Sequence, residues 1–199
     1  MNERITLVIL VMALLVLINL GDLQDSPDAV VEKYLKAVRA GDYETAYTYI
    51  SRTDNTIIEW LELIRYIRRE APAPIVSMID LAHFLSRQQI VKTTINGGKA
   101  VVEVDSVVPD MGKTLDIARS EAAVGVMHEH GTLPMRERHG ICELAVEDGR
   151  WRITCVRGIS ASQAAELATE LAEKILGKED AAKLAQKIED FQKRRKRGT

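Results

Sequence analysis

From residue 27 to about residue 86, the apolar residues recur three or four positions apart, which is typical of amphipathic helices. The first helix should begin at Pro27 with Ser26 as its N-cap and should end at Gly41. Asp42 then caps a short second helix. A third helix is expected over about residues 54–70 and a fourth over about residues 75–86, separated by the Ala-Pro-Ala-Pro sequence of residues 71–74.

The period of the pattern then changes from 3.6 to 2, which indicates β-strands. Residues 90–95 and 98–107 flank Asn96-Gly97 and predict a hairpin in which Val91 faces Val102 and Thr93 faces Ala100. Residues 113–127 fit either a helix or a bent strand, and we favour a helix for their first part. Residues 132–140 are expected to form a loop.

A second hairpin is expected over residues 142–155, with Asp148-Gly149 as its two-residue turn. This turn predicts the facing pairs 147/150, 146/151, 145/152, 144/153, 143/154 and 142/155. The chain has two cysteines, Cys142 and Cys155, and they would face each other at a non-hydrogen-bonded site, where Cα atoms lie ~4.5 Å apart. We therefore expect a disulfide; the alternative is two reduced thiols that behave as small apolar residues.

After Gly158 the composition changes to Ala, Glu, Leu and Lys, which predicts two further amphipathic helices separated by Gly177. Their apolar stripes need a partner, which can be the preceding domain, each other or a second copy of the chain. We expect a homo-oligomer or an envelope protein to bind through residues 160–191.

Residues 5–20 form an apolar run interrupted only by Thr6 and Asn19, and extending it to residue 23 gives nearly a full membrane span. No small-x-small cleavage site follows, so we expect an uncleaved signal anchor; a cleaved signal peptide or a buried helix are the alternatives. Arg4 precedes the run and acidic residues follow it. The positive-inside rule then places the domain on the periplasmic or extracellular side of the inner membrane, where disulfides persist.

Charge is distributed unevenly along the 199 residues. The formal net charge is −2, but the tail of residues 193–197 carries five positive charges, so the rest of the chain sums to −7. This balance argues against a nucleic-acid-binding domain, and the sequence has no zinc-type Cys/His spacing or glycine-rich phosphate loop, so we expect no cofactor. The tail is either a solvated helix end or a contact for anionic lipid headgroups, made by Lys193, Arg194, Arg195, Lys196 and Arg197.

Helices followed by antiparallel hairpins predict an α+β domain, with the helices on one face of a curved antiparallel sheet. Residues 26–47, which include an acid-Val-Val helix and Gly41-Asp42-Tyr43, resemble the opening of small bacterial proteins of the nuclear transport factor 2-like (cystatin-like cone) superfamily. Residues 146–153 are similar to the last hairpin of that superfamily. The resemblance implies a cone-shaped sheet around a pocket. We expect a signal anchor at residues 1–24, this domain at 25–158, and C-terminal helices with a basic tail at 159–199.

Several residues are candidates for a site, although no catalytic constellation is evident. An acid or base inside the implied pocket is needed for an isomerase-like enzyme, and the residues expected near the pocket are Tyr47, Trp151, Asp80 and His83. Glu103 and Asp105 are further candidates, but they alternate with the apolar face of their strand. The residues that could form a metal site are His128, His130 and His139, with a solvated polar loop as the alternative.

These observations favour a membrane-anchored, extracytoplasmic, non-enzymatic module of the bacterial envelope that binds or assembles other components. The alternative is a small-molecule-binding protein or an isomerase-like enzyme that uses the cone pocket. A deep cavity lined by polar side chains favours the alternative, and a cavity filled by Tyr47, Trp151 and aliphatic residues counts against it.

Overall fold

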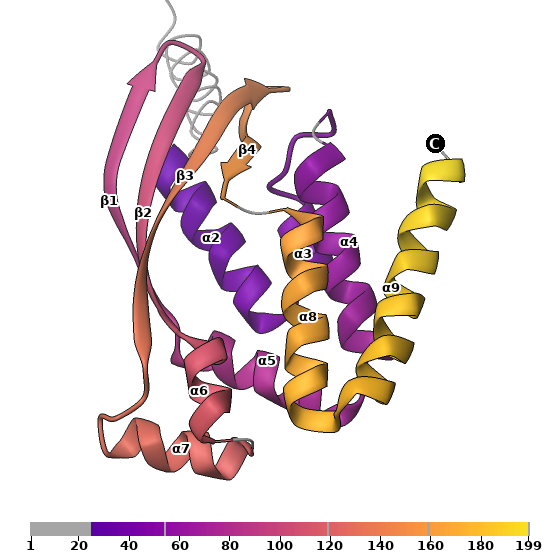
Figure 1. Ribbon diagram of the computed structural model, residues 1–199. Helices are drawn as coiled ribbons and strands as arrows, with labels where there is room; N and C mark the ends of the chain where they lie inside the picture. Colours follow the sequence, from indigo (N-terminus) through magenta and orange to yellow (C-terminus); the bar gives the residue numbers. More distant parts are fainter. Residues whose placement is uncertain (1–24, 54, 119, 159, 199) are drawn as a thin grey trace, which may run out of the picture.

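A computed structural model describes residues 25–198, apart from residues 54, 119 and 159. The protein is α+β, with helices packed on one face of a curved antiparallel sheet of four strands in the order β1-β2-β3-β4 (Figure 1). The elements are α2 (Pro27–Ala40), α3 (Tyr43–Tyr47), α4 (Asn55–Glu70), α5 (Ala73–Leu85), β1 (Arg87–Asn96), β2 (Lys99–Pro109), α6 (Met111–Ile117), α7 (Glu121–Glu129), β3 (Met135–Glu147), β4 (Arg150–Arg157), α8 (Ala161–Leu176) and α9 (Lys178–Gly198).

The membrane segment expected at residues 5–23 lies outside the described residues. Within the described part of the chain, no helix is both long enough and apolar enough to cross a membrane.

The N-terminal helices begin and end where their capping residues predict. Gly41 ends α2 with a φ of 71°, in the left-handed region that glycine adopts most easily. A Cβ at this position would also lie 2.7 Å from Nη1 of Arg68, so that side chain would have to move. The side chain of Asp42 accepts a hydrogen bond from the Thr45 backbone N–H at 3.0 Å and so caps α3.

Two apolar clusters stabilise the fold. The first, called the sheet core, joins α2, α3 and the first half of α4 to the inner face of β2, β3 and β4 through residues such as Val31, Leu61, Val102, Leu144 and Ile153. The second, called the helix core, joins the second half of α4 to α5, α6, α7, α8 and α9.

The first hairpin forms, but its predicted register is wrong. Thr93 faces Val102 rather than Ala100, because the turn uses Gly97-Gly98 and Asn96 pairs with Lys99. A bulge at Val91, between the pairs of Ile90 and Lys92, adds a further shift. Glycine tolerates the positive φ of 58° at position 97 better than asparagine would.

The second hairpin confirms the Asp148-Gly149 turn, in which both residues have positive φ (50° and 74°) as a type I′ turn requires. The first four predicted pairs are present, from Glu147/Arg150 to Leu144/Ile153. A bulge then interrupts the register, so Glu143 pairs with Cys155 and Cys142 pairs with Val156.

This bulge overturns the predicted pairing of Cys142 with Cys155. One extra residue on β4 moves every later side chain to the other face of the sheet. Val156 therefore takes the inward position and packs on the sheet core, while Cys155 shares the outward position of Glu143. No disulfide joins the cysteines, and both side chains are thiols.

The segment that sequence left open between helix and strand is helical, in α6 and α7. Asp110 and Ser120 cap these helices by accepting hydrogen bonds from the backbone N–H groups of Lys113 and Ala123. The loop expected at residues 132–140 is shorter than predicted, because β3 already begins at Met135.

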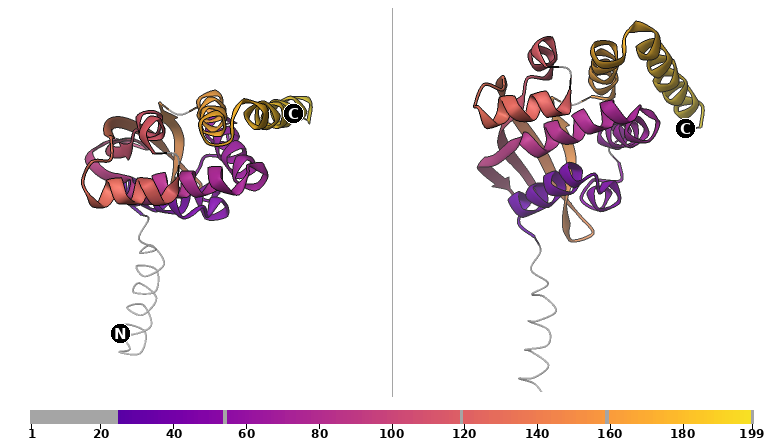
Figure 2. Two further views of the ribbon diagram at one scale, coloured as in Figure 1. Left: turned by 60° about the horizontal axis from the view of Figure 1, so that its bottom comes forward. Right: turned by 90° about the horizontal axis from the view of Figure 1, so that it is seen from below.

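The C-terminal helices form an antiparallel pair at the side of the molecule (Figure 2). Of the partners considered for their apolar stripes, the preceding domain and the other C-terminal helix are both observed. The buried residues on these stripes belong to the helix core: Ala168, Leu171, Ala172, Ala181, Leu184 and Ile188. Phe191 also stacks on Tyr66 of α4, with ring centroids 4.3 Å apart.

Candidate functional site

Among the described residues, two cavities beside the inner face of the sheet are candidates for a binding site. The first, called the α2 cavity, has a volume of about 280 Å³ and lies between α2, α5 and the inner face of β2 and β3. The second, called the α8 cavity, has a volume of about 510 Å³ and lies between α4, α5, α8 and the α6 end of the same strands. The two cavities share a wall of five residues: Trp60, His83, Ser86, Val108 and Arg138. Cavities of this size with mixed apolar and polar linings are typical of small-ligand sites.

The sequence of β3 explains why space remains next to the sheet. Its inward positions carry large apolar side chains only near the hairpin turn, and further back they carry Gly140, Arg138 and Arg136. Gly140 faces Val104 and contributes no side chain to the cavity. A Cβ on Gly140 would lie 3.7 Å from the Val104 carbonyl oxygen, an ordinary contact, and φ there is not positive. The backbone therefore does not require glycine at this position, but the volume of the cavity depends on it.

The charged side chains that line the α2 cavity are basic. Its lining includes Arg39, Arg138 and Arg157, and no aspartate or glutamate belongs to it among the described residues. Arg157 is paired with Glu143, and Arg39 donates a hydrogen bond to Oε1 of Gln88 at 2.8 Å. Arg138 forms no ion pair or side-chain hydrogen bond within the described part of the chain. Arg138 thus lines both cavities, is exposed to solvent, and has no carboxylate partner among the described residues.

The surroundings of Arg138 disfavour its positive charge. Burial and the neighbouring guanidinium of Arg136 lower the pKa of Arg138, and the more distant carboxylate of Asp110 opposes this effect. The acids that line the α8 cavity already have cationic partners: Asp110 lies 3.8 Å from Nζ of Lys113, and Glu170 lies 3.5 Å from Nζ of Lys174. An anion placed beside Arg138 would compensate a charge that no protein carboxylate compensates.

Of the four residues expected near the pocket, His83 lines both cavities. Its Nδ1 is buried and has no hydrogen-bond partner among the described residues. Burial and the nearby guanidinium of Arg68 lower its pKa, so the neutral imidazole is favoured at pH 7.

The other three expected pocket residues lie elsewhere. Asp80 forms an ion pair with Arg68 at 2.5 Å. Trp151 packs against the sheet core, as a core tryptophan would. Tyr47 is on α3, where burial raises the pKa of its hydroxyl to about 12. None of these three lines either cavity.

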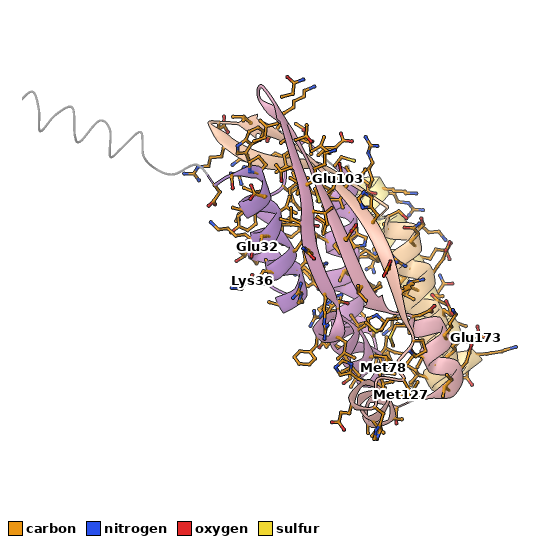
Figure 3. All side chains as sticks on the ribbon, turned by 90° about the vertical axis from the view of Figure 1, so that its left-hand side faces the viewer. Glu32, Lys36, Met78, Glu103, Met127 and Glu173 are labelled. Carbon is orange, nitrogen blue, oxygen red and sulfur yellow. The ribbon has the colours of Figure 1, made fainter. Side chains whose placement is uncertain are left out.

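The structure does not bring the three histidines of the suggested metal site together. His128 and His130 are at the end of α7, whereas His139 is on β3, and its Nδ1 lies 2.8 Å from Oδ1 of Asp105 on the outer face of the sheet. Glu103 lies on the same face (Figure 3). In the part of the chain that the structure describes, no group of three or more His, Cys, Asp or Glu side chains is arranged to hold a metal ion.

Some residues of the basic tail already form ion pairs or hydrogen bonds within the protein. Nε of Arg195 lies 2.7 Å from Oε2 of Glu62 on α4, and Lys193 pairs with Glu189 one turn earlier on α9. Arg194 bonds to the backbone carbonyl of Asp190. Contact of the whole tail with lipid headgroups therefore remains a prediction, and Arg195 is the residue least available for it.

The sequence alone does not identify Arg138, Gly140 or Trp60 as cavity residues. The sequence predicts a loop at residues 132–140, although Arg136 and Arg138 alternate with Glu137 and His139 as they would along a strand. This alternation of basic and other polar residues was the available signal. Trp60 packs against the sheet core and also lines both cavities.

No protein-family model and no curated protein matches the chain. Four chains of solved structures match it, including the following two. One is the solution structure of RPA3114, a SEC-C motif containing protein from Rhodopseudomonas palustris, with 12% identity and a TM-score of 0.41 over 69% of this chain and 81% of that one. The other is the crystal structure of AclR, a proposed hydroxylase from Streptomyces galilaeus, with 9% identity and a TM-score of 0.38 over 73% of this chain and 85% of that one. At these TM-scores neither similarity supports a function for this chain.

Proposed function

We propose that this protein is a membrane-anchored, non-enzymatic binding module that holds a small ligand in the α2 cavity. The observation that carries the proposal is the cavity itself. It borders the inner face of the sheet, it has an apolar wall that includes Leu35, Val38 and Trp60, and its lining includes Arg138, which forms no ion pair with a described residue. A few polar groups on a largely apolar wall are the usual composition of ligand sites.

The setting of this module is part of the proposal. The apolar run at residues 5–20 supports a signal anchor in the inner membrane, with the domain facing the periplasm or the cell exterior. The order of the helices and the Asp148-Gly149 hairpin support membership of the nuclear transport factor 2-like superfamily. The curved sheet with helices on its inner face is compatible with that cone-like architecture.

Binding is favoured over assembly because the apolar faces of α8 and α9 already pack against the rest of the chain. Their apolar residues are buried in the helix core, so these stripes give no argument for a second copy or an envelope protein at residues 160–191. Binding is also favoured over catalysis, because an arginine stays protonated at neutral pH and does not exchange protons with a substrate.

The proposal can be tested by filling the cavity. The full chain in lipid nanodiscs is titrated with N-phenyl-1-naphthylamine, a neutral apolar fluorophore. Gly140→Leu places a side chain in the α2 cavity without a backbone clash and should weaken binding at least tenfold relative to the wild type. Gly125→Leu, on α7 and outside both cavities, is the control variant. Nanodiscs of the same lipid without protein are titrated in parallel to correct for partition of the probe into lipid. Equal binding by wild type and a folded Gly140→Leu variant would refute the proposal.

A proton-transfer enzyme is the second candidate, and His83 is the observation in its favour. A neutral imidazole with an unbonded Nδ1 at the wall of a cavity is suited to act as a general base. Ligand turnover that disappears in His83→Gln, while binding is retained, would favour the enzyme over the binding module.

A further inference from the structure

The charged residues that line the α2 cavity are basic, although the chain as a whole is acidic. The residues before the basic tail sum to −7, yet the lining of the α2 cavity contains arginines and no carboxylate among the described residues. Clefts lined by charge of one sign concentrate ligands of the opposite sign, and low-dielectric walls strengthen the effect. Anionic molecules are therefore favoured at this cavity although the chain as a whole would repel them.

Arg138 is the group in a position to recognise such an anion. It extends from an inward position of β3, opposite Ser106, and belongs to the wall shared by both cavities. Arg136 follows two residues earlier on the same face, opposite Val108, and lines the α8 cavity. A guanidinium presents a planar set of N–H donors that matches the two oxygens of a carboxylate or sulfonate.

The other residues that line the cavity are mostly apolar and favour a ligand with an apolar body. The wall that Arg138 shares with both cavities also includes Trp60 and Val108, and Gly140 in the α2 cavity carries no side chain. The α2 cavity continues over Leu35, Val38 and Val104. A small inorganic anion would leave these apolar surfaces in contact with water, whereas an amphiphile would cover them.

We propose that the ligand of this cavity is an anionic amphiphile, a molecule with one carboxylate or sulfonate group bound by Arg138 and an apolar body packed between α2 and the sheet. This inference rests on the proposed function, because it assigns the ligand class of the same cavity. A fatty acid released from the membrane and an aromatic acid from solution share this chemistry.

The test compares two probes with the same aromatic body on the full chain in nanodiscs. 1-Anilinonaphthalene-8-sulfonate carries a sulfonate, and N-phenyl-1-naphthylamine does not. Arg138→Gln should weaken binding of the sulfonate about tenfold, the effect of losing one charge-assisted contact, and should change binding of the neutral probe less than twofold. Arg152→Gln, on the outer face of β4, is the matched control and should change neither.

Displacement of the bound sulfonate separates the two sources of ligand. Decanoate should displace it if the site is suited to acyl chains, and 1-naphthoate should do so if it is suited to aromatic acids, while decanol should be weaker than decanoate. Equal displacement by decanol, or no displacement by either acid, would overturn the inference.

The two proposals fail in different ways. If the neutral probe binds wild type and Gly140→Leu equally, the α2 cavity is not a ligand site and both proposals are wrong. If Gly140→Leu weakens the neutral probe but Arg138→Gln affects both probes equally or neither, the cavity binds ligands and only the anionic class is wrong.

Discussion

The thiol of Cys142 offers a sharp test of the β3–β4 register. It is buried at an inward position of β3 and pairs with Val156, not with Cys155. Burial, with a smaller contribution from Cys155, raises the pKa of Cys142 from 9.0 to about 12. Because the thiolate is the reactive form, a difference of 3 pKa units lowers the reactive fraction at pH 8 about a thousandfold.

The measurement uses the Cys155→Ser variant of the full chain, in which Cys142 is the remaining cysteine. Its reaction with 5,5′-dithiobis(2-nitrobenzoate) at pH 8 should be at least about a thousandfold slower in the native state than in guanidinium chloride, since burial also blocks access. In Cys142→Ser, the half-buried Cys155 should react much faster. A native Cys142 that reacts within tenfold of the unfolded rate would refute the reasoning. So would a wild-type protein whose thiols react only after reduction, because that result would show the disulfide predicted from sequence.

Three further predictions concern stability, each measured by urea denaturation. Ile153→Ala should lower the free energy of unfolding by about 2–5 kcal/mol, because Ile153 is fully buried in the sheet core; a loss below 1 kcal/mol would contradict that packing. In a double-mutant cycle of Arg68→Met and Asp80→Asn, the coupling should be about 1 kcal/mol, since the Asp80 side chain is 46% exposed and solvent screens the pair. The lowered pKa of His83 means that the unfolded state binds the proton more tightly, so stability is complete above the ordinary value of 6.5 and is lost as pH falls below it. His83→Gln should therefore reduce the stability difference between pH 7.5 and pH 5.5, and an unchanged difference would contradict the assignment.

The helices could be predicted well because their signals are local. Pro27 at the first position of α2, Gly41 at its end and Asp42 as the N-cap of α3 are signals that depend on a few neighbouring residues. The type I′ turn at Asp148-Gly149 is local in the same sense, and it fixed the nearest pairs of the second hairpin.

The strand registers could not be predicted to their ends, because bulges depend on tertiary packing. Nothing in residues 142–155 indicates that β4 gains a residue, yet the bulge lets Val156 join the sheet core in place of Cys155. The cavity could not be predicted either. Whether Arg138 and Gly140 border a hollow depends on how far α5 and α8 stand from β3, which the pattern of one strand does not encode.

The central claim is that a small molecule binds between α2 and the inner face of the sheet, next to Trp60. The chain has two tryptophans, so Trp151→Phe leaves Trp60 as the only energy donor. Energy transfer from Trp60 to bound 1-anilinonaphthalene-8-sulfonate should then be strong, and adding Gly140→Leu should abolish it. Transfer that is absent, or that persists unchanged with Leu at position 140, would contradict the account.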